Sequence, residues 1–206
     1  MSDNYLTFSL SVFTGFFAIM NPIANTPIFM GLVGDSSDDV KKRIAKRATI
    51  TAFVIVTAFV ILGKYIFELF GITIPAFKMT GGILIFYIGF EMLLSQKSKI
   101  HTQEHIEVDD GVAISPLAIP ILAGPGTIVS AMNNVTNADF IHIGIVVLIF
   151  ALMVYLTYLA FTLSEKIVDK LGHNLIAVMG KLMGLILAII GAGMTIDGIK
   201  LAFNIG

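Results

Sequence analysis

Long apolar runs separated by short polar stretches dominate the chain. A helix needs about 20 residues to cross the hydrocarbon core of a bilayer, and six runs approach or exceed that length. They are Leu6 to Val33, Ala48 to Phe70, Met79 to Leu94, Val112 to Ala131, Ile141 to Leu163 and Leu182 to Phe203. The pattern predicts an all-α integral membrane protein with six transmembrane helices.

The first and fourth runs are interrupted by prolines at matching spacing. The first contains "NPIANTP", with Pro22 and Pro27, and the fourth contains "IPILAGPG", with Pro120 and Pro125. Proline removes a backbone donor and clashes with the preceding helical turn, so each pair predicts a discontinuous helix. Unpaired backbone groups are costly in lipid, which indicates that each break is buried in protein or lines a cavity.

A second matched motif indicates an internal repeat. "KMTGGIL" from Lys78 and "KLMGLIL" from Lys181 agree at four of seven positions. We interpret residues 1–98 and 111–206 as two three-helix repeats joined by a cytoplasmic connector over 99–110. Three spans is an odd number, so the second repeat is predicted to be inverted. Inverted repeats with matching interrupted helices are typical of secondary transporters, whose substrates bind at the breaks.

Composition supports a membrane protein and argues against several other classes. Of the 206 residues, 56% are hydrophobic and 13% are charged, with a mean hydropathy of +0.91. The net charge of −1 gives no basic footprint for nucleic acid. The chain has no cysteine, and its sequence offers no paired carboxylates or HExxH motif for an intramembrane enzyme. We therefore expect no enzyme activity and no cofactor.

Basic residues are concentrated in alternate connectors. The connectors after the first, third and fifth runs hold most of them: Lys41, Lys42, Arg43, Lys46, Arg47, Lys97, Lys99, Lys166, Lys170 and Lys181. The other connectors and the spans hold Lys64, Lys78 and Lys200. Lys and Arg favour the cytoplasmic side, so both termini are predicted to face outward.

Each break predicts a short helix that begins inside the membrane. Thr26 would be an N-cap with Pro27 at the first helical position, and Gly124 with Pro125 repeats that arrangement. Helix N-termini attract anionic groups, whereas the carbonyls that end the preceding half-helix suit an ammonium group or a small cation. The breaks thus predict a site for a small zwitterion.

The side chains at the breaks fit such a ligand because none of them is charged. We predict that the substrate-binding residues are Asn21, Asn25, Thr26, Ala123, Gly124, Gly126, Thr127 and Ser130. The small residues of the second break would let the backbone approach the ligand closely. In the alternative interpretation, the prolines only kink packed helices, and Asn and Thr satisfy the freed backbone groups.

Two carboxylates lie within the later spans. Glu91 and Asp197 are candidates for carrying a coupling proton, because intramembrane carboxylates often act in relays. The alternatives are an interfacial position for Glu91 and an i,i+3 ion pair between Asp197 and Lys200. His101 and His105 have a metal-binding spacing, but acidic residues surround them in a polar connector. We interpret that connector as a solvated loop and predict no metal site.

The segments "MNPIANTPIF" and "PLAIPILAGPGTI" together resemble the signature pair of the MarC/SnatA family of membrane proteins. "FKMTGGILIF" and "KLMGLILAIIGAG" resemble that family's third and sixth spans, so the resemblance covers nearly the whole chain. It implies two inverted three-helix repeats in a prokaryotic inner membrane. It also implies transport of small neutral amino acids such as glycine and alanine. The sequence has no ATP-binding P-loop, so any uphill transport must use an ion gradient, of H⁺ or Na⁺, or a partner subunit. An exporter of other small neutral solutes and a non-transporting regulatory protein are the alternatives.

Overall fold

The computed structural model describes residues 5–33, 36–94, 113–136 and 138–205, and every regular element in this part of the chain is helical. The elements are α1 (Tyr5–Met20), α2 (Thr26–Val33), α3 (Asp38–Phe70), α4 (Ile74–Leu94), the π-helix η1 (Ala113–Leu122), α5 (Pro125–Val135), α6 (Phe140–Thr162) and α7 (Ser164–Phe203). The connector predicted over 99–110, with His101 and His105, lies outside the described residues.

The helices confirm a membrane protein. Four segments of the described chain are long and apolar enough to cross a bilayer: Asp38–Gly63, Ile74–Leu94, Phe140–Thr162 and Asn174–Phe203. Helix α1 is apolar but has only 16 residues, which corresponds to about 24 Å at 1.5 Å per residue. It is too short to cross a core of about 30 Å alone, because the chain breaks at Asn21 where the sequence predicts a discontinuity.

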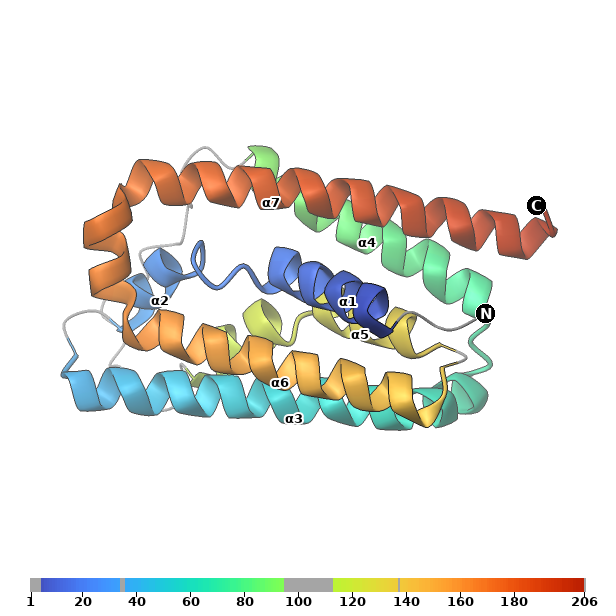
Figure 1. The fold of residues 1–206 in the computed structure, drawn as a ribbon, viewed down its shortest axis with the longest axis horizontal. Coiled ribbons are helices and arrows are strands. Elements are labelled where there is room, and N and C mark those ends of the chain that lie inside the picture. Colours follow the sequence, from blue (N-terminus) through green and yellow to red (C-terminus); the bar gives the residue numbers. More distant parts are fainter. Residues whose placement is uncertain (1–4, 34–35, 95–112, 137, 206) are drawn as a thin grey trace.

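The predicted connector between Leu163 and Leu182 is largely helical and is shorter than the apolar runs indicate, because the last spanning segment begins at Asn174. Helix α7 already begins at Ser164, and its first part runs across the end of the bundle (Figure 1). The segment "SEKIVDKL" consists mostly of residues that tolerate a helix well, so it continues the helical pattern. The change of direction falls at Gly172, whose φ of 73° and ψ of 154° are accessible mainly to glycine.

The helices form three groups. Helices α3 and α6 pack together along one edge of the molecule, and α4 and α7 pack along the opposite edge, with α1, α2 and α5 between them (Figure 1). The larger apolar core lies among α1, α2, α3, η1, α5 and α6. Aromatic pairs contribute to it: the rings of Phe29 and Phe161 are stacked with centroids 4.5 Å apart, and those of Phe16 and Phe150 are tilted with centroids 5.1 Å apart.

Helices α4 and α7 approach each other closely enough to form a pair of their own. A Cβ placed on Gly82 would lie 2.6 Å from the carbonyl oxygen of Gly191, and one on Gly89 would lie 2.5 Å from that of Gly184. From the first contact to the second, the residue number rises by seven on α4 and falls by seven on α7, so the two helices are antiparallel. Small residues allow this backbone approach, which favours van der Waals packing between helices in lipid. We call these two helices the α4/α7 pair.

The α4/α7 pair has its own small core. Ile85, Leu187 and Met194 form it together with Ala18 of α1, separately from the larger cluster. The pair therefore packs on the rest of the molecule through a limited set of side chains, and the cluster includes Ala18 and Ile19 from the last turn of α1.

Candidate functional site at two adjacent helix breaks

The two breaks lie side by side because α1 and α5 pack against each other in antiparallel fashion. A Cβ on Gly126 would lie 3.9 Å from Cγ2 of Ile19, and one on Gly15 would lie 3.8 Å from Oγ of Ser130. Moving four residues back along α1 thus corresponds to moving four residues forward along α5. The same register brings Asn21 to the level of Gly124, so the last turn of α1 meets the first turn of α5.

Side chains of the first break close it on itself. The Asn21 side-chain oxygen accepts a hydrogen bond from the backbone N–H of Ala24 at 3.3 Å, and Asn25 Nδ2 donates to the carbonyl of Met20 at 2.7 Å. Asn21 has a φ of 35°, a left-handed conformation that asparagine tolerates better than most residues. Two asparagines therefore satisfy backbone groups that Pro22 and the end of α1 would leave unpaired.

The predicted capping role of Thr26 is wrong. Thr26 is already the first residue of α2, and its hydroxyl donates to the carbonyl of Ile23 at 2.7 Å instead of accepting from the next turn. The tight turn over Pro22–Asn25 places that carbonyl within reach, so the hydroxyl bonds backward along the chain. Thr26 is fully buried and helps to hold the shape of the break.

The second break has fewer side-chain bonds of its own. It follows η1, where the N–H of Ala123 donates to the carbonyl of Ala118, five residues earlier. Gly124 is the N-cap of α5 with an extended backbone, and Pro125 occupies the start of the helix, as the sequence predicts. Gly124 has no side chain with which to cap. The N–H groups of Gly126 and Thr127 in the first turn have no intrahelical partners, as at any helix start.

Each break also contains a buried polar atom without a hydrogen-bond partner. These atoms are Asn21 Nδ2 and Thr127 Oγ1, on residues that are only 2% and 1% exposed. Five helical threonines elsewhere donate to the carbonyl four residues earlier: Thr14, Thr49, Thr157, Thr162 and Thr195. An unpaired buried polar group costs about 1–3 kcal/mol, so each of these two groups would be stabilised by a hydrogen-bonding partner.

Two other buried atoms lack partners in the described chain, and neither lies at a break. Thr57 Oγ1 belongs to the middle of α3, and Asn133 Oδ1 lies well along α5 from its first turn. The unpaired groups that the sequence singled out are thus Asn21 and Thr127.

Helix α4 covers the first turn of α5. A Cβ on Gly126 would lie 2.9 Å from Cδ1 of Ile88, so the isoleucine side chain rests directly on the buried glycine. Sequence analysis did not identify Ile88. It lies in a long apolar helix, where one isoleucine carries no signal that separates it from its neighbours.

The remaining predicted binding residues take supporting positions. Ser130 faces Gly15 of α1, and its carbonyl accepts a hydrogen bond from Asn134 Nδ2 at 2.8 Å. On the side of the first break, the Cβ of Ala24 would lie 3.7 Å from a Cβ on Gly180 of α7. The first break therefore contacts α7 and the second contacts α4.

The two candidate coupling carboxylates are exposed. Glu91 lies near the end of α4 and Asp197 lies late in α7, and neither belongs to the breaks. The ion pair considered for Asp197 and Lys200 does not form between these two described residues. Two carboxylates outside the spans have lowered pKa values. A hydrogen bond from the backbone of His142 lowers the pKa of Asp139, and one from the Lys41 side chain lowers the pKa of Glu165.

A cleft of about 820 Å³ opens at one end of the molecule, away from the predicted binding residues. The end of α3, the turn between α3 and α4, and the second half of α5 line it, with Phe67, Thr73, Met132 and Thr136 among its walls. Met132 packs on Gly63, where a Cβ would lie 3.1 Å from the methionine methyl group. The cleft thus reaches α5 beyond the breaks.

Comparison with known sequences finds similarity to a family of integral membrane proteins. The family model described as "MarC family integral membrane protein" matches residues 6–203. A UPF0056 membrane protein of Pyrococcus horikoshii is 40% identical, over 94% of this chain and 95% of its own. The UPF0056 membrane protein YvbG of Bacillus subtilis is 38% identical, over 97% of both chains. No solved structure matches the chain.

Proposed function

The chain belongs to the MarC family of integral membrane proteins, and from this premise we propose that it transports small neutral amino acids of the glycine and alanine class. The observation that carries the proposal is the pair of unpartnered buried groups, Asn21 Nδ2 and Thr127 Oγ1, at two adjacent helix breaks. Groups of this kind favour a polar ligand that completes their hydrogen bonds.

The polarity of the two helix ends suits a zwitterion. The first turn of α5 offers the N–H groups of Gly126 and Thr127 to a carboxylate, and the positive end of the helix dipole favours that charge. The C-terminal carbonyls of α1 suit an ammonium group. Neither break contains a charged side chain, so a substrate with net charge would lack a counter-ion in a low-dielectric site.

We assign the chain six spans in two inverted repeats, with α1–α2 and η1–α5 each forming one discontinuous span. Contacts between corresponding spans support this assignment, since α1 of the first span packs on α5 of the fourth, α3 packs on α6 and α4 packs on α7. The two discontinuous spans also run in opposite directions through the molecule (Figure 1). Alternating access in this scheme draws on an H⁺ or Na⁺ gradient, for which Glu91 and Asp197 remain the candidate proton carriers.

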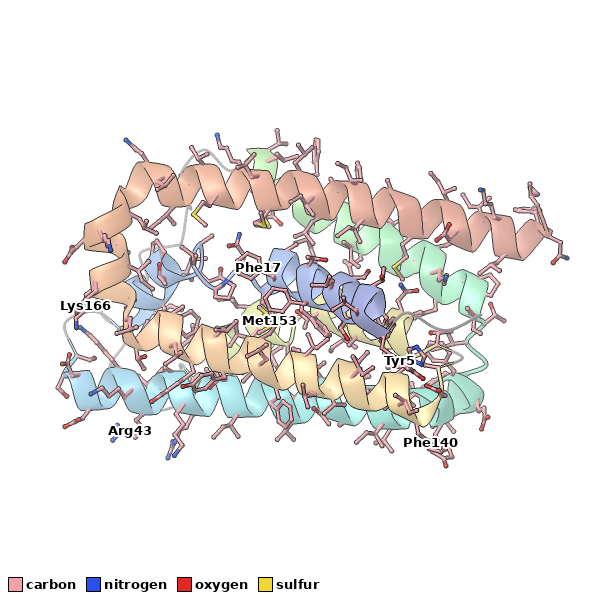
Figure 2. The ribbon with its side chains drawn as sticks, viewed as in Figure 1. Tyr5, Phe17, Arg43, Phe140, Met153 and Lys166 are labelled. Carbon is pink, nitrogen blue, oxygen red and sulfur yellow. The ribbon has the colours of Figure 1, made fainter. Side chains whose placement is uncertain are left out.

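The proposed orientation places both termini outside the cell. Arg43 and Lys166 lie at one end of the helix bundle, and Tyr5 and Phe140 lie at the other (Figure 2). This separation supports a cytoplasmic position for the basic end. A cysteine introduced at the exposed Ser37 should resist membrane-impermeant reagents in intact cells and react after permeabilisation. Labelling of this cysteine in intact cells would contradict the proposed orientation.

A flux assay tests the function directly. Purified protein in proteoliposomes should take up labelled glycine under an imposed H⁺ or Na⁺ gradient, and unlabelled alanine or serine should compete. Glutamate and lysine should not compete, because the breaks hold no opposite charge. The matched control is the double variant Asn21→Gly/Thr127→Val, which removes both unpartnered groups and keeps a residue that accepts the φ of position 21. Absence of uptake by the wild-type protein under either gradient would contradict the proposal.

A further inference from the structure

Ile88 occupies a particular place relative to the second break. Its Cδ1 atom would lie 2.9 Å from a Cβ on Gly126, nearer than any other atom that meets this position. The next atom is Cγ2 of Ile19, at 3.9 Å. Two isoleucines from different helices thus cover the glycine at the start of α5, and Ile88 is the closer of the two.

The first turn of α5 shows two independent features of a ligand site. Its N–H groups have no partners within the helix, and Thr127, which is 1% exposed, holds a hydroxyl without a partner. The unpartnered amide of Asn21 lies in the adjacent break. The apolar side chain of Ile88 thus packs on the same helical turn that carries the unpartnered N–H groups and the Thr127 hydroxyl.

Ile88 comes from the α4/α7 pair and not from the helices that build the breaks. It packs beside the small apolar cluster that contains Ala18 and Ile85. Its contact with Gly126 is made by the terminal methyl group, so the Ile88 side chain can be shortened without altering backbone packing. In contrast, Gly89, the next residue of α4, packs against the backbone of α7.

We infer that Ile88 sets the upper size limit of the substrate side chain. This inference rests on the proposed function and names a specificity-determining residue for it. A carboxylate bound to the N–H groups of Gly126 and Thr127 brings the substrate α-carbon near the side chains that cover Gly126. Glycine and alanine leave that space nearly empty, whereas a branched side chain would meet Cδ1 of Ile88.

Shortening Ile88 should widen the selectivity of transport. One methylene group in an apolar pocket discriminates between substrates by about tenfold to 200-fold. For Ile88→Ala we expect the flux of valine or leucine relative to glycine to rise at least tenfold. Ile88→Val removes only the terminal methyl and should shift the same ratio in the same direction by a smaller factor. Ile88→Phe should reduce alanine flux relative to glycine.

The test compares substrate ratios in proteoliposomes, so it does not depend on the amount of active protein. Ile83→Ala is the matched control, because Ile83 lies on the same helix with 59% of its surface exposed. The control should keep the wild-type ratio. If Ile88→Ala or Ile88→Val moves glycine at a wild-type ratio to valine, the inference is overturned while the proposed function stands. If the wild-type protein moves no glycine, the proposed function fails first and the inference with it.

Discussion

The two helix breaks differ in how they use their polar groups, although their prolines have the same spacing. At the first break, Asn25 Nδ2 and Thr26 Oγ1 both bond to nearby carbonyls, and only one side-chain donor, on Asn21, is left over. At the second break the capping residue is Gly124, and the Thr127 hydroxyl has no partner.

Under the proposed function, this difference makes the first break mainly a supporting element and the second break the main binding element. A break whose donors are satisfied internally holds its own shape and offers little to a ligand. A break capped by glycine leaves the helix N-terminus available, and its lack of side-chain bulk allows close approach. We therefore expect substitutions at the second break to affect the ligand more than the fold, and most substitutions at the first break to do the reverse. Asn21 is the exception within the first break.

The largest expected effect concerns the contact between the first break and α7. The Cβ of Ala24 and a Cβ on Gly180 would be 3.7 Å apart, close to the spacing in disulfides. Alternating access requires groups of helices around the site to move relative to one another, and we propose that the α4/α7 pair moves relative to the broken helices. Oxidation of Ala24→Cys/Gly180→Cys should then stop glycine flux completely. Reductant should restore it.

The natural chain contains no cysteine, so the cross-link is unambiguous. Each single variant, treated with the same oxidant, serves as a control and should transport normally. Undiminished flux in a fully cross-linked sample would show that the first break and α7 stay together throughout transport.

The second prediction places bulk at the binding break. Gly126→Val puts a branched side chain where the substrate carboxylate is expected, and it also pushes against Ile88. Loss of one charge-assisted hydrogen bond, at about 1.5–3 kcal/mol, lowers affinity by about tenfold or more. Titration of glycine by calorimetry or by flux should show this loss.

Gly144→Val is the matched control because no atom lies within 4 Å of a Cβ at that helical position. Gly89 is unsuitable for this purpose, since a Cβ there would lie 2.5 Å from backbone atoms of α7. Wild-type affinity in a folded Gly126→Val protein would remove Gly126 from the site.

The third prediction compares two buried threonines. Thr127→Val removes a hydroxyl that bonds to nothing, whereas Thr157→Val removes one that donates to the carbonyl of Met153. A neutral hydrogen bond contributes about 0.5–1.5 kcal/mol. Thr127→Val should therefore weaken glycine affinity by up to about tenfold without lowering the melting temperature. Thr157→Val should lower the melting temperature and leave glycine affinity unchanged. A drop in melting temperature for Thr127→Val alone would assign that hydroxyl a structural role.

The smallest effect on transport is expected at the first break. Asn25→Ala removes the bond from Nδ2 to the carbonyl of Met20 and should lower stability by about 1 kcal/mol. Glycine affinity of the folded variant should change less than twofold. Thermal melts and binding titrations on the same preparation measure both quantities. A large loss of affinity at unchanged stability would place Asn25 among the ligand-binding residues and erase the contrast between the breaks.

Local chemistry determined much of this protein from its sequence alone. Long apolar runs predicted membrane helices because the bilayer requires them, and the proline pairs predicted where two helices break because proline has no N–H to donate. Gly124 with Pro125 predicted the start of α5 correctly. Asn21 and Thr127 were predicted as binding residues because they are uncharged polar residues at these breaks, and that role stays a prediction.

Tertiary packing decided what those residues do. Asn25 and Thr26 could each face a ligand or turn back to the chain, and only the folded break shows that both turn back. Helix α7 comprises two helical segments that meet at a kink at Gly172, where the backbone leaves helical geometry and the chain changes direction. Ile88 acquires its position over Gly126 through contact between helices far apart in sequence. The hydrophobic pattern of a sequence predicts that a residue is buried in protein or lipid. Which residue it contacts depends on how helices that are separate in sequence pack together.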